Sequence, residues 1–169
     1  KPSPEGGWRI TSAHYQRLGG PVKALNEHAG RVLADPQFKE RQDLAARIFQ
    51  QLTDIREGRD QRRPARLSRL AELTGGDPGD VTAVVEHFFR ASFLTSPDRG
   101  RTPDWEVDIT HESLIRQWEQ LREWAKAEAA DGEEYREFAK RAARGGDLLT
   151  GTDLDLALKW LGKKRNAAW

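Results

Sequence analysis

His111 is the residue whose type and position most favour a binding chemistry. It directly follows a predicted strand and begins a predicted helix. The first turn of a helix offers free backbone N–H groups and the positive end of the helix dipole, so an anion such as a phosphate is stabilised there. The imidazole can donate a further hydrogen bond to the same anion. Position alone also fits a second interpretation, in which His111 is a packed residue at a helix start.

The remaining three histidines have less distinctive positions. His14 and His28 lie in predicted helices, where solvated or half-buried structural roles are common. His87 precedes two phenylalanines and lies off their apolar face. None of the three is a candidate for binding chemistry.

Six arginines gather in residues 56–69, with two acidic residues among them. Arg62, Arg63 and Arg66 are candidates for weak contacts with anions. A solvated or interdomain surface with salt bridges explains the same residues, and we favour that interpretation. Because Pro64 ends regular structure within the run, the segment is predicted to be a linker or a domain edge.

The sequence contains no motif that predicts catalysis within this chain. It lacks a Gly-x-x-x-x-Gly-Lys-Ser/Thr phosphate loop, a Gly-x-Gly-x-x-Gly fingerprint, a His-Glu-x-x-His motif and the acid spacing of a calcium loop. It also has no cysteine that could act as a nucleophile or a thiolate ligand. We therefore predict that the chain is not an enzyme by itself and has no catalytic residue, metal ligand or cofactor of its own.

The composition is typical of a polar globular protein with one or two small domains. The 169 residues include 28 lysines and arginines against 27 acidic residues, for a formal net charge of +1. This balance excludes the strong positive field of a general nucleic-acid binder. No stretch approaches the roughly 20 apolar residues that span a bilayer, so we predict a cytoplasmic protein without membrane contact. Because the sequence opens on Lys1, we expect a piece of a longer protein.

Hydrophobic periodicity predicts the elements that position His111. Residues 1–56 show apolar spacings of three and four and predict a helical subdomain, in which Asp35-Pro36 ends one helix and begins the next. Two more helices precede a short hairpin with strands at residues 93–95 and 105–110. Helix, helix and hairpin in this order predict a winged-helix domain over residues 57–129.

The helix that begins near His111 carries the most continuous apolar stripe in the chain. The stripe consists of Leu114, Ile115, Trp118, Leu121, Trp124 and Ala125. We predict one unbroken helix over it, with Thr110 as its N-cap and its end at Asp131-Gly132. Residues 130–169 are then a helical arm that leads to a C-terminal sensor region outside this sequence. The predicted fold class is mainly α, with a helical packet, a winged-helix domain with a small β-hairpin, and C-terminal helices.

A winged helix also suggests a DNA-binding transcriptional regulator, which is the alternative function. In such proteins the helix before the hairpin enters the major groove and carries Arg, Lys, Asn or Gln on its outer face. The outward positions of the helix at residues 80–91 are Asp80, Thr82, Glu86, His87 and Arg90. This nearly neutral set cannot neutralise several phosphates, so DNA is not an expected partner.

One run of residues resembles a known family. Residues 108–118 spell Asp-Ile-Thr-His-Glu-Ser-Leu-Ile-Arg-Gln-Trp, and Leu121-Arg122-Glu123-Trp124 follows. This run is similar to a signature of the bacterial STAND-class signalling NTPases of the AAA+ superfamily, and weaker similarity covers nearly the whole chain. The resemblance implies the helical, winged-helix and arm region that lies C-terminal to the nucleotide-binding core of such a protein.

In that family the histidine at the strand-to-helix junction contacts the β-phosphate of bound ADP and holds the closed, inactive form. The resemblance gives this role to His111, although Thr110 and Glu112 stand where the family motif has Met and Asp. It further implies a regulatory relay between an upstream P-loop core and downstream sensor repeats. The parent protein, an ATPase, would bind ADP or ATP with magnesium. The implied partners are those two regions of the same chain and, on activation, further copies of the protein.

Overall fold

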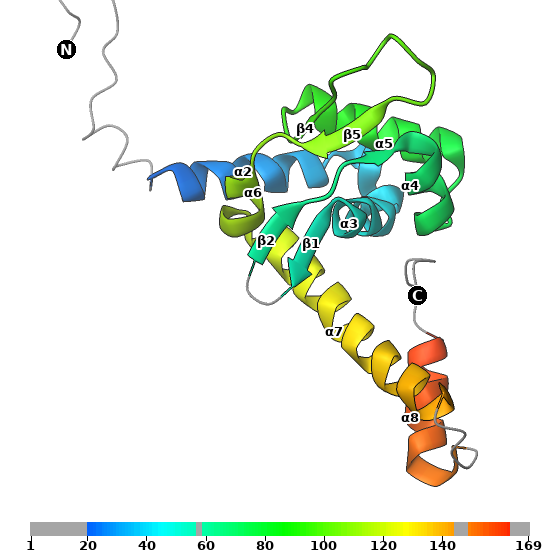
Figure 1. Cartoon of the computed structure of the whole chain (residues 1–169). Helices are drawn as coiled ribbons and strands as arrows, with labels where there is room; N and C mark the ends of the chain where they lie inside the picture. The colour runs from blue at the N-terminus through cyan, green and yellow to red at the C-terminus, as the bar shows by residue number, and fades with distance from the viewer. Residues whose placement is uncertain (1–19, 57–58, 144–148, 163–169) are drawn as a thin grey trace, which may run out of the picture.

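The computed structural model describes residues 20–56, 59–143 and 149–162. Helices dominate these residues, and two small antiparallel sheets lie among them (Figure 1). The prediction of a mainly α fold with a small β-hairpin is therefore confirmed. One long helix leaves the body of the molecule, and a short helix lies beside its far end (Figure 1).

The described body begins with three helical segments. They are the helix α2 (Gly20–Leu33), the 3-10 helix η1 (Pro36–Arg41) and the helix α3 (Gln42–Gln51). Asp35 caps η1, because its side chain accepts a hydrogen bond from Gln37 N at 3.0 Å. The predicted boundary at Asp35-Pro36 is confirmed.

The arginine-rich run supplies the second strand of a β-hairpin, so the prediction of a linker is wrong. Strands β1 (Thr53–Arg56) and β2 (Arg59–Arg62) pair antiparallel. Arg63 N donates to Leu52 O at 2.9 Å, which ties the hairpin to the end of α3. Arginine is compatible with such a hairpin, because the ladder uses backbone groups while long charged side chains can keep their ends in water.

The predicted helix pair before the second hairpin is confirmed. It consists of α4 (Leu67–Thr74) and α5 (Pro78–Arg90). Gly75 ends α4 in the left-handed region at φ 63°, where glycine is favoured. Asp77 caps α5 by accepting hydrogen bonds of 2.8 and 3.2 Å from two N–H groups of the first turn.

A second small sheet has the strand order β3-β5-β4. Its strands are β3 (Ala65–Arg66), β4 (Leu94–Thr95) and β5 (Glu106–Ile109). Strands β4 and β5 pair antiparallel, so the predicted hairpin is confirmed. Val107 and Ile109 of β5 are buried while their neighbours are half-buried, which is the alternation that predicted this strand.

The apolar stripe around Trp118 is not one helix, so the prediction of an unbroken helix there is wrong. Helix α6 (Glu112–Gln117) ends at Trp118, whose ψ of 104° is extended, and α7 (Glu119–Ala143) begins at the next residue. The Trp118 ring is buried, with its centroid 5.0 Å from those of Phe49 and Phe93. Burial of this large ring helps offset the helix hydrogen bonds that the break removes.

Helix α7 continues through Asp131-Gly132, so the predicted break at this point is also wrong. One glycine inside a helix costs about 1 kcal/mol, which packing can offset. The short helix α8 (Gly151–Leu161) supplies that packing, because Trp160 donates from Nε1 to Asp131 O at 3.3 Å and stacks on Tyr135 at 5.6 Å between centroids. The boundary predicted between residues 129 and 130 lies inside this helix.

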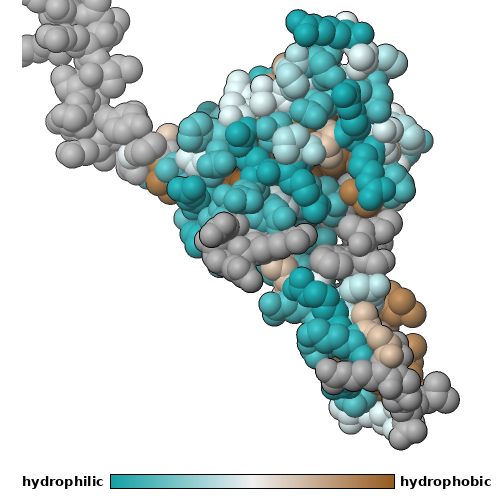
Figure 2. Space-filling view, in the orientation of Figure 1, coloured by the Kyte–Doolittle hydropathy of each residue, from teal (hydrophilic) through white to brown (hydrophobic). Residues whose placement is uncertain are grey.

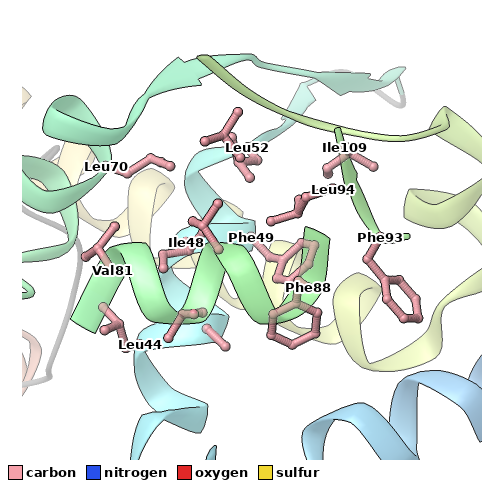
Figure 3. Close-up of a cluster of buried hydrophobic side chains, with 14 of the residues drawn as sticks. Leu44, Ile48, Phe49, Leu52, Leu70, Val81, Phe88, Phe93, Leu94 and Ile109 are labelled. Carbon is pink, nitrogen blue, oxygen red and sulfur yellow. The ribbon is translucent and has the colours of Figure 1, made fainter. Parts of the chain in front are cut away.

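A continuous apolar core holds the second sheet and α6 against the helices. In Figure 3, Phe49 of α3 lies beside Phe88 of α5, and Phe93, which precedes β4, lies on the other side of Phe88 with 6.0 Å between the two centroids. The Phe49 and Phe88 rings meet edge to face, 4.9 Å between centroids and at 84°. Ile109, the last residue of β5, is completely buried. The core therefore fixes the end of β5, from which the chain continues into His111.

Hydrophobic side chains are also exposed at the end of the arm. Figure 2 shows hydrophilic residues over most of the visible body and hydrophobic ones beside α8. The exposed leucines of α8 are Leu154, Leu156, Leu158 and Leu161.

Candidate functional site

His111 is itself the N-cap of α6. Its Nδ1 accepts a hydrogen bond from Ser113 N at 3.0 Å, and Ser113 Oγ lies 2.9 Å from the same atom. The prediction of Thr110 as the N-cap is wrong. Thr110 instead extends the β4–β5 pairing, since its N–H donates to Phe93 O at 3.1 Å and its Oγ1 donates to Ser92 O at 3.0 Å.

This cap fixes the tautomer of the His111 ring. A ring nitrogen that accepts a hydrogen bond from a backbone N–H carries no proton, so the proton of the neutral imidazole is on Nε2. The side chain is exposed. Within the part of the chain that the structure describes, no hydrogen bond to His111 Nε2 is found. The junction therefore presents one N–H donor to the outside.

Arg62 is the charged side chain that the fold brings to this junction. From the end of β2, its Nη1 donates to Asp108 Oδ2 at 2.5 Å and to Ile109 O at 3.2 Å. Its Nε lies 4.0 Å from Glu112 Oε1. Arg62 thus contacts residues on both sides of His111 and joins the first hairpin to the end of β5 and the start of α6.

The charges around His111 nearly balance. Arg62 and Arg116 face Asp108 and Glu112, with 3.9 Å between Arg116 Nη2 and Glu112 Oε2. An anion at this place would therefore be selected by directed hydrogen bonds more than by an excess of positive charge.

The other two arginine candidates lie elsewhere and have partners in the chain. Arg63 donates from Nε to Gln51 O at 2.9 Å and from Nη2 to Gln51 Oε1 at 2.8 Å. Arg66 donates from Nη1 to Asp98 Oδ2 at 2.7 Å and to Asp104 O at 2.8 Å. The structure therefore brings Arg62, but neither Arg63 nor Arg66, to the His111 junction.

The loop between β4 and β5 is organised by Asp98. Its Oδ1 accepts a hydrogen bond from Glu106 N at 2.8 Å. This backbone hydrogen bond, with smaller contributions from Arg66 and Ser96, holds the pKa of Asp98 below its ordinary value. Asp98 therefore fastens the loop most firmly when it is ionised.

Two other histidines have structural contacts. His28 lies with Nε2 3.2 Å from Ala91 O and its ring stacks on Phe93. His87 lies with Nε2 3.0 Å from Val32 O and stacks on Phe38 at 3.8 Å between centroids. His14 lies outside the described residues.

The outward groups of α5 are engaged by other parts of the same chain. Asp80 Oδ1 accepts from Arg41 Nη2 at 2.6 Å, and Glu86 Oε2 accepts from Arg99 Nη2 at 2.7 Å. The Arg99 guanidinium also lies 4.3 Å from the ring centroid of Phe89. These contacts join α5 to η1 and to the β4–β5 loop. They leave few side chains on α5 that could contact the bases of DNA.

The described residues contain no group of three or more His, Asp or Glu side chains that could hold a metal ion. In the same residues no helix has both the length and the apolar character needed to cross a bilayer.

The sequence singled out His111 and Arg62 as separate candidates but did not indicate that they lie at the same junction. Arg62 was predicted only as one of several arginines, because its approach to Asp108 depends on the pairing of β1 with β2. Ser113 was missed as a ring partner. The available signal is its position two residues after His111, because a capping side chain accepts a hydrogen bond from the backbone N–H at this position. A serine there also brings its hydroxyl close to the capping atom.

Comparison with known proteins gives one family. A family model described as Novel STAND NTPase 1 matches residues 3–144. Comparisons with curated proteins and with solved structures give no match.

Proposed function

The chain belongs to the novel STAND NTPase 1 family, and on this premise we propose that it is a regulatory relay of a STAND-type signalling protein. The relay would couple the nucleotide state of an upstream P-loop core to sensor repeats downstream in the same protein. ADP or ATP with magnesium would be bound by that core. Neighbouring copies of the protein would become partners on activation.

The single observation that carries this proposal is the hydrogen bonding of the His111 ring, which leaves an N–H donor on Nε2. Its Nδ1 is used by the cap, and its Nε2 carries a proton that can be donated to an anion from outside the described chain. A β-phosphate of ADP is such an anion. Because the cap holds the ring at a fixed backbone position, the hydrogen bond would form only in one arrangement of the core and the relay.

The order of the elements supports the winged-helix part of the proposal. After helix α3 and the β1–β2 hairpin, strand β3, helices α4 and α5, and strands β4 and β5 follow one another along the chain, with the sheet order β3-β5-β4. The β4–β5 loop would be the wing. The outer side chains of α5 pair with other groups of this chain and do not support the DNA-binding alternative.

Helix α7 supports the relay part of the proposal. It has 25 residues, which corresponds to about 37 Å at 1.5 Å per residue. It begins shortly after His111, at the end of α6. Because the start of α7 is anchored to the body, a rotation of the whole body relative to the nucleotide-binding core would displace groups far from the nucleotide.

Two substitutions of His111 separate a sensor from a cap. His111→Ala removes both the cap and the Nε2 donor, whereas His111→Ser keeps a good capping side chain and removes only the donor. In the intact protein with its nucleotide-binding core, both variants should release ADP faster. A hydrogen bond to a charged group is worth about 1.5–3 kcal/mol, which corresponds to roughly 10- to 150-fold.

The ADP release rates of the two variants, compared with the wild type, can also refute the proposal. If His111→Ser retains ADP like the wild type while His111→Ala does not, the residue acts only as a cap. Normal ADP retention in both variants would exclude any contact between His111 and the nucleotide. His28→Ser is the matched control, because it removes a histidine whose contacts lie within the body.

A further inference from the structure

The break between α6 and α7 lies in a segment whose sequence favours one helix. The apolar side chains from Leu114 to Ala125 keep helical spacing across the break. A continuous helix would bond Glu119 N to Ile115 O and Leu121 N to Gln117 O. The break removes these bonds, so other groups of the protein must stabilise the bent arrangement.

Asn26 of α2 supplies both kinds of hydrogen bond at the break. Its Nδ2 donates to Gln117 O at 2.9 Å, the last carbonyl of α6. Its Oδ1 accepts from Glu119 N at 2.9 Å, the first N–H of α7. The same Nδ2 also donates to Val22 O at 2.8 Å within α2, which orients the amide. One side chain thus pairs with one of the acceptors and one of the donors that the interruption leaves free.

Helix α7 is the better anchored of the two helices that meet at Trp118. Gln50 of α3 donates from Nε2 to Trp124 O at 3.0 Å. Trp118 and Leu121 are almost completely buried. Helix α6 has six residues and buries only Leu114 and Ile115. Release of the break would therefore move α6, and His111 with it, more than the start of α7.

We propose that Asn26 is a conformational latch that stabilises the bent α6–α7 arrangement over a continuous helix and so sets where the His111 junction lies on the body. The latch is a property of the fold and does not depend on whether His111 contacts a nucleotide. Each of its two hydrogen bonds across the break favours the bent state by roughly 2- to 12-fold.

The test uses the distance between two spin labels on this chain. Because the sequence has no cysteine, Glu112→Cys and Glu133→Cys place labels at two exposed positions on α6 and α7 only. These positions are 21 residues apart, so a continuous helix separates their Cα atoms by about 32 Å. The bent wild-type chain should give a shorter distance. The long Arg62–Glu112 contact is removed equally in every variant.

Asn26→Ala removes both hydrogen bonds and should increase the ratio of the long to the short population by roughly 4- to 150-fold. Asn26→Asp, which keeps the acceptor but has no donor, should give a smaller shift in the same direction. Gln42→Ala is the matched control, because it removes a side-chain amide that donates to Leu33 O at 2.8 Å away from the break. It should leave the distances unchanged.

Glu119→Pro provides the reverse test. Proline fits the first position of α7 but cannot continue a helix from α6, because it lacks the N–H and clashes with the preceding turn. Added to Asn26→Ala, it should restore the short distance. Wild-type distances in folded Asn26→Ala, or an equal shift in Gln42→Ala, would overturn the proposal. If Asn26→Ala does not fold, wild-type distances in Asn26→Asp would overturn it. No nucleotide is present in any sample, so the result is independent of the His111 test.

Discussion

Trp118→Ala tests whether the break and the aromatic core around it stabilise the body. The Trp118 side chain is 1% exposed. Its ring centroid lies 5.0 Å from those of Phe49 and Phe93 and 5.6 Å from that of Trp124. The substitution removes a large buried ring and leaves a cavity between three aromatic side chains.

The expected loss follows from this burial. Large-to-small substitutions of buried Phe or Trp cost about 3–5 kcal/mol, and aromatic pairs add roughly 0.5–1.5 kcal/mol each beyond area. Because these contributions overlap, we expect about 4 kcal/mol in total. Domains are stable by only about 5–15 kcal/mol, so much of the stability is removed. For a chain of this size the melting temperature should fall by roughly 8–16 °C.

The assay is urea and thermal unfolding followed by circular dichroism. Trp118→Phe keeps an apolar ring and should lose clearly less than Trp118→Ala. Trp160→Ala is the matched control, since that buried tryptophan packs on Tyr135 and Phe138 of the arm, and its removal should leave the unfolding of the body nearly unchanged. A loss below about 1 kcal/mol for Trp118→Ala would refute the reasoning from burial.

Three further predictions concern the loop, the chemistry and the partners of the chain. The pKa of Asp98 is lowered in the folded state, so ionised Asp98 stabilises the fold. This effect is complete above the ordinary aspartate pKa of about 3.9 and is lost as the pH falls through the lower folded value. Asp98→Asn should therefore reduce the loss of stability at acid pH, measured by unfolding at a series of pH values. The chain alone should hydrolyse neither ATP nor GTP, because its sequence has no phosphate loop, and turnover that follows the purified protein peak would contradict this. Sequence-specific duplex binding at physiological salt should be absent in a competition assay, whereas sub-micromolar binding that an unrelated duplex does not displace would contradict it.

The elements that the sequence predicted correctly are those whose signals are local. The helix boundary at Asp35-Pro36 and the alternating strand β5 each depend on residues within one or two turns of the feature. The first hairpin lacked such a signal. Its strands β1 and β2 contain charged residues instead of alternating apolar ones, and their pairing is a backbone property that composition does not reveal.

The break at Trp118 could not be predicted for a different reason. The apolar stripe is continuous, and the group that satisfies the freed backbone belongs to Asn26, 91 residues from Gln117. The capping of α6 is a related case. Thr110 is the better capping residue by type, but its Oγ1 donates to Ser92 O and its N–H donates to Phe93 O. These contacts hold Thr110 against the end of the sheet and leave the cap to His111. The sequence therefore singled out His111 as a candidate but could not show that its Nδ1 caps α6 while its Nε2 has no partner in the described residues.

The location of α6 gives a physical reason why this segment would respond first to a change at the junction. At its start, Glu112 lies 4.0 Å from Arg62 Nε, and the same guanidinium donates its short hydrogen bond to Asp108 instead. Its end is held by the Asn26 amide. Segments with few buried apolar contacts open at a lower free energy than the core around them. A ligand that accepts a hydrogen bond from His111 would therefore act on a short helix that buries only Leu114 and Ile115 and lies between the second sheet and the anchored start of α7.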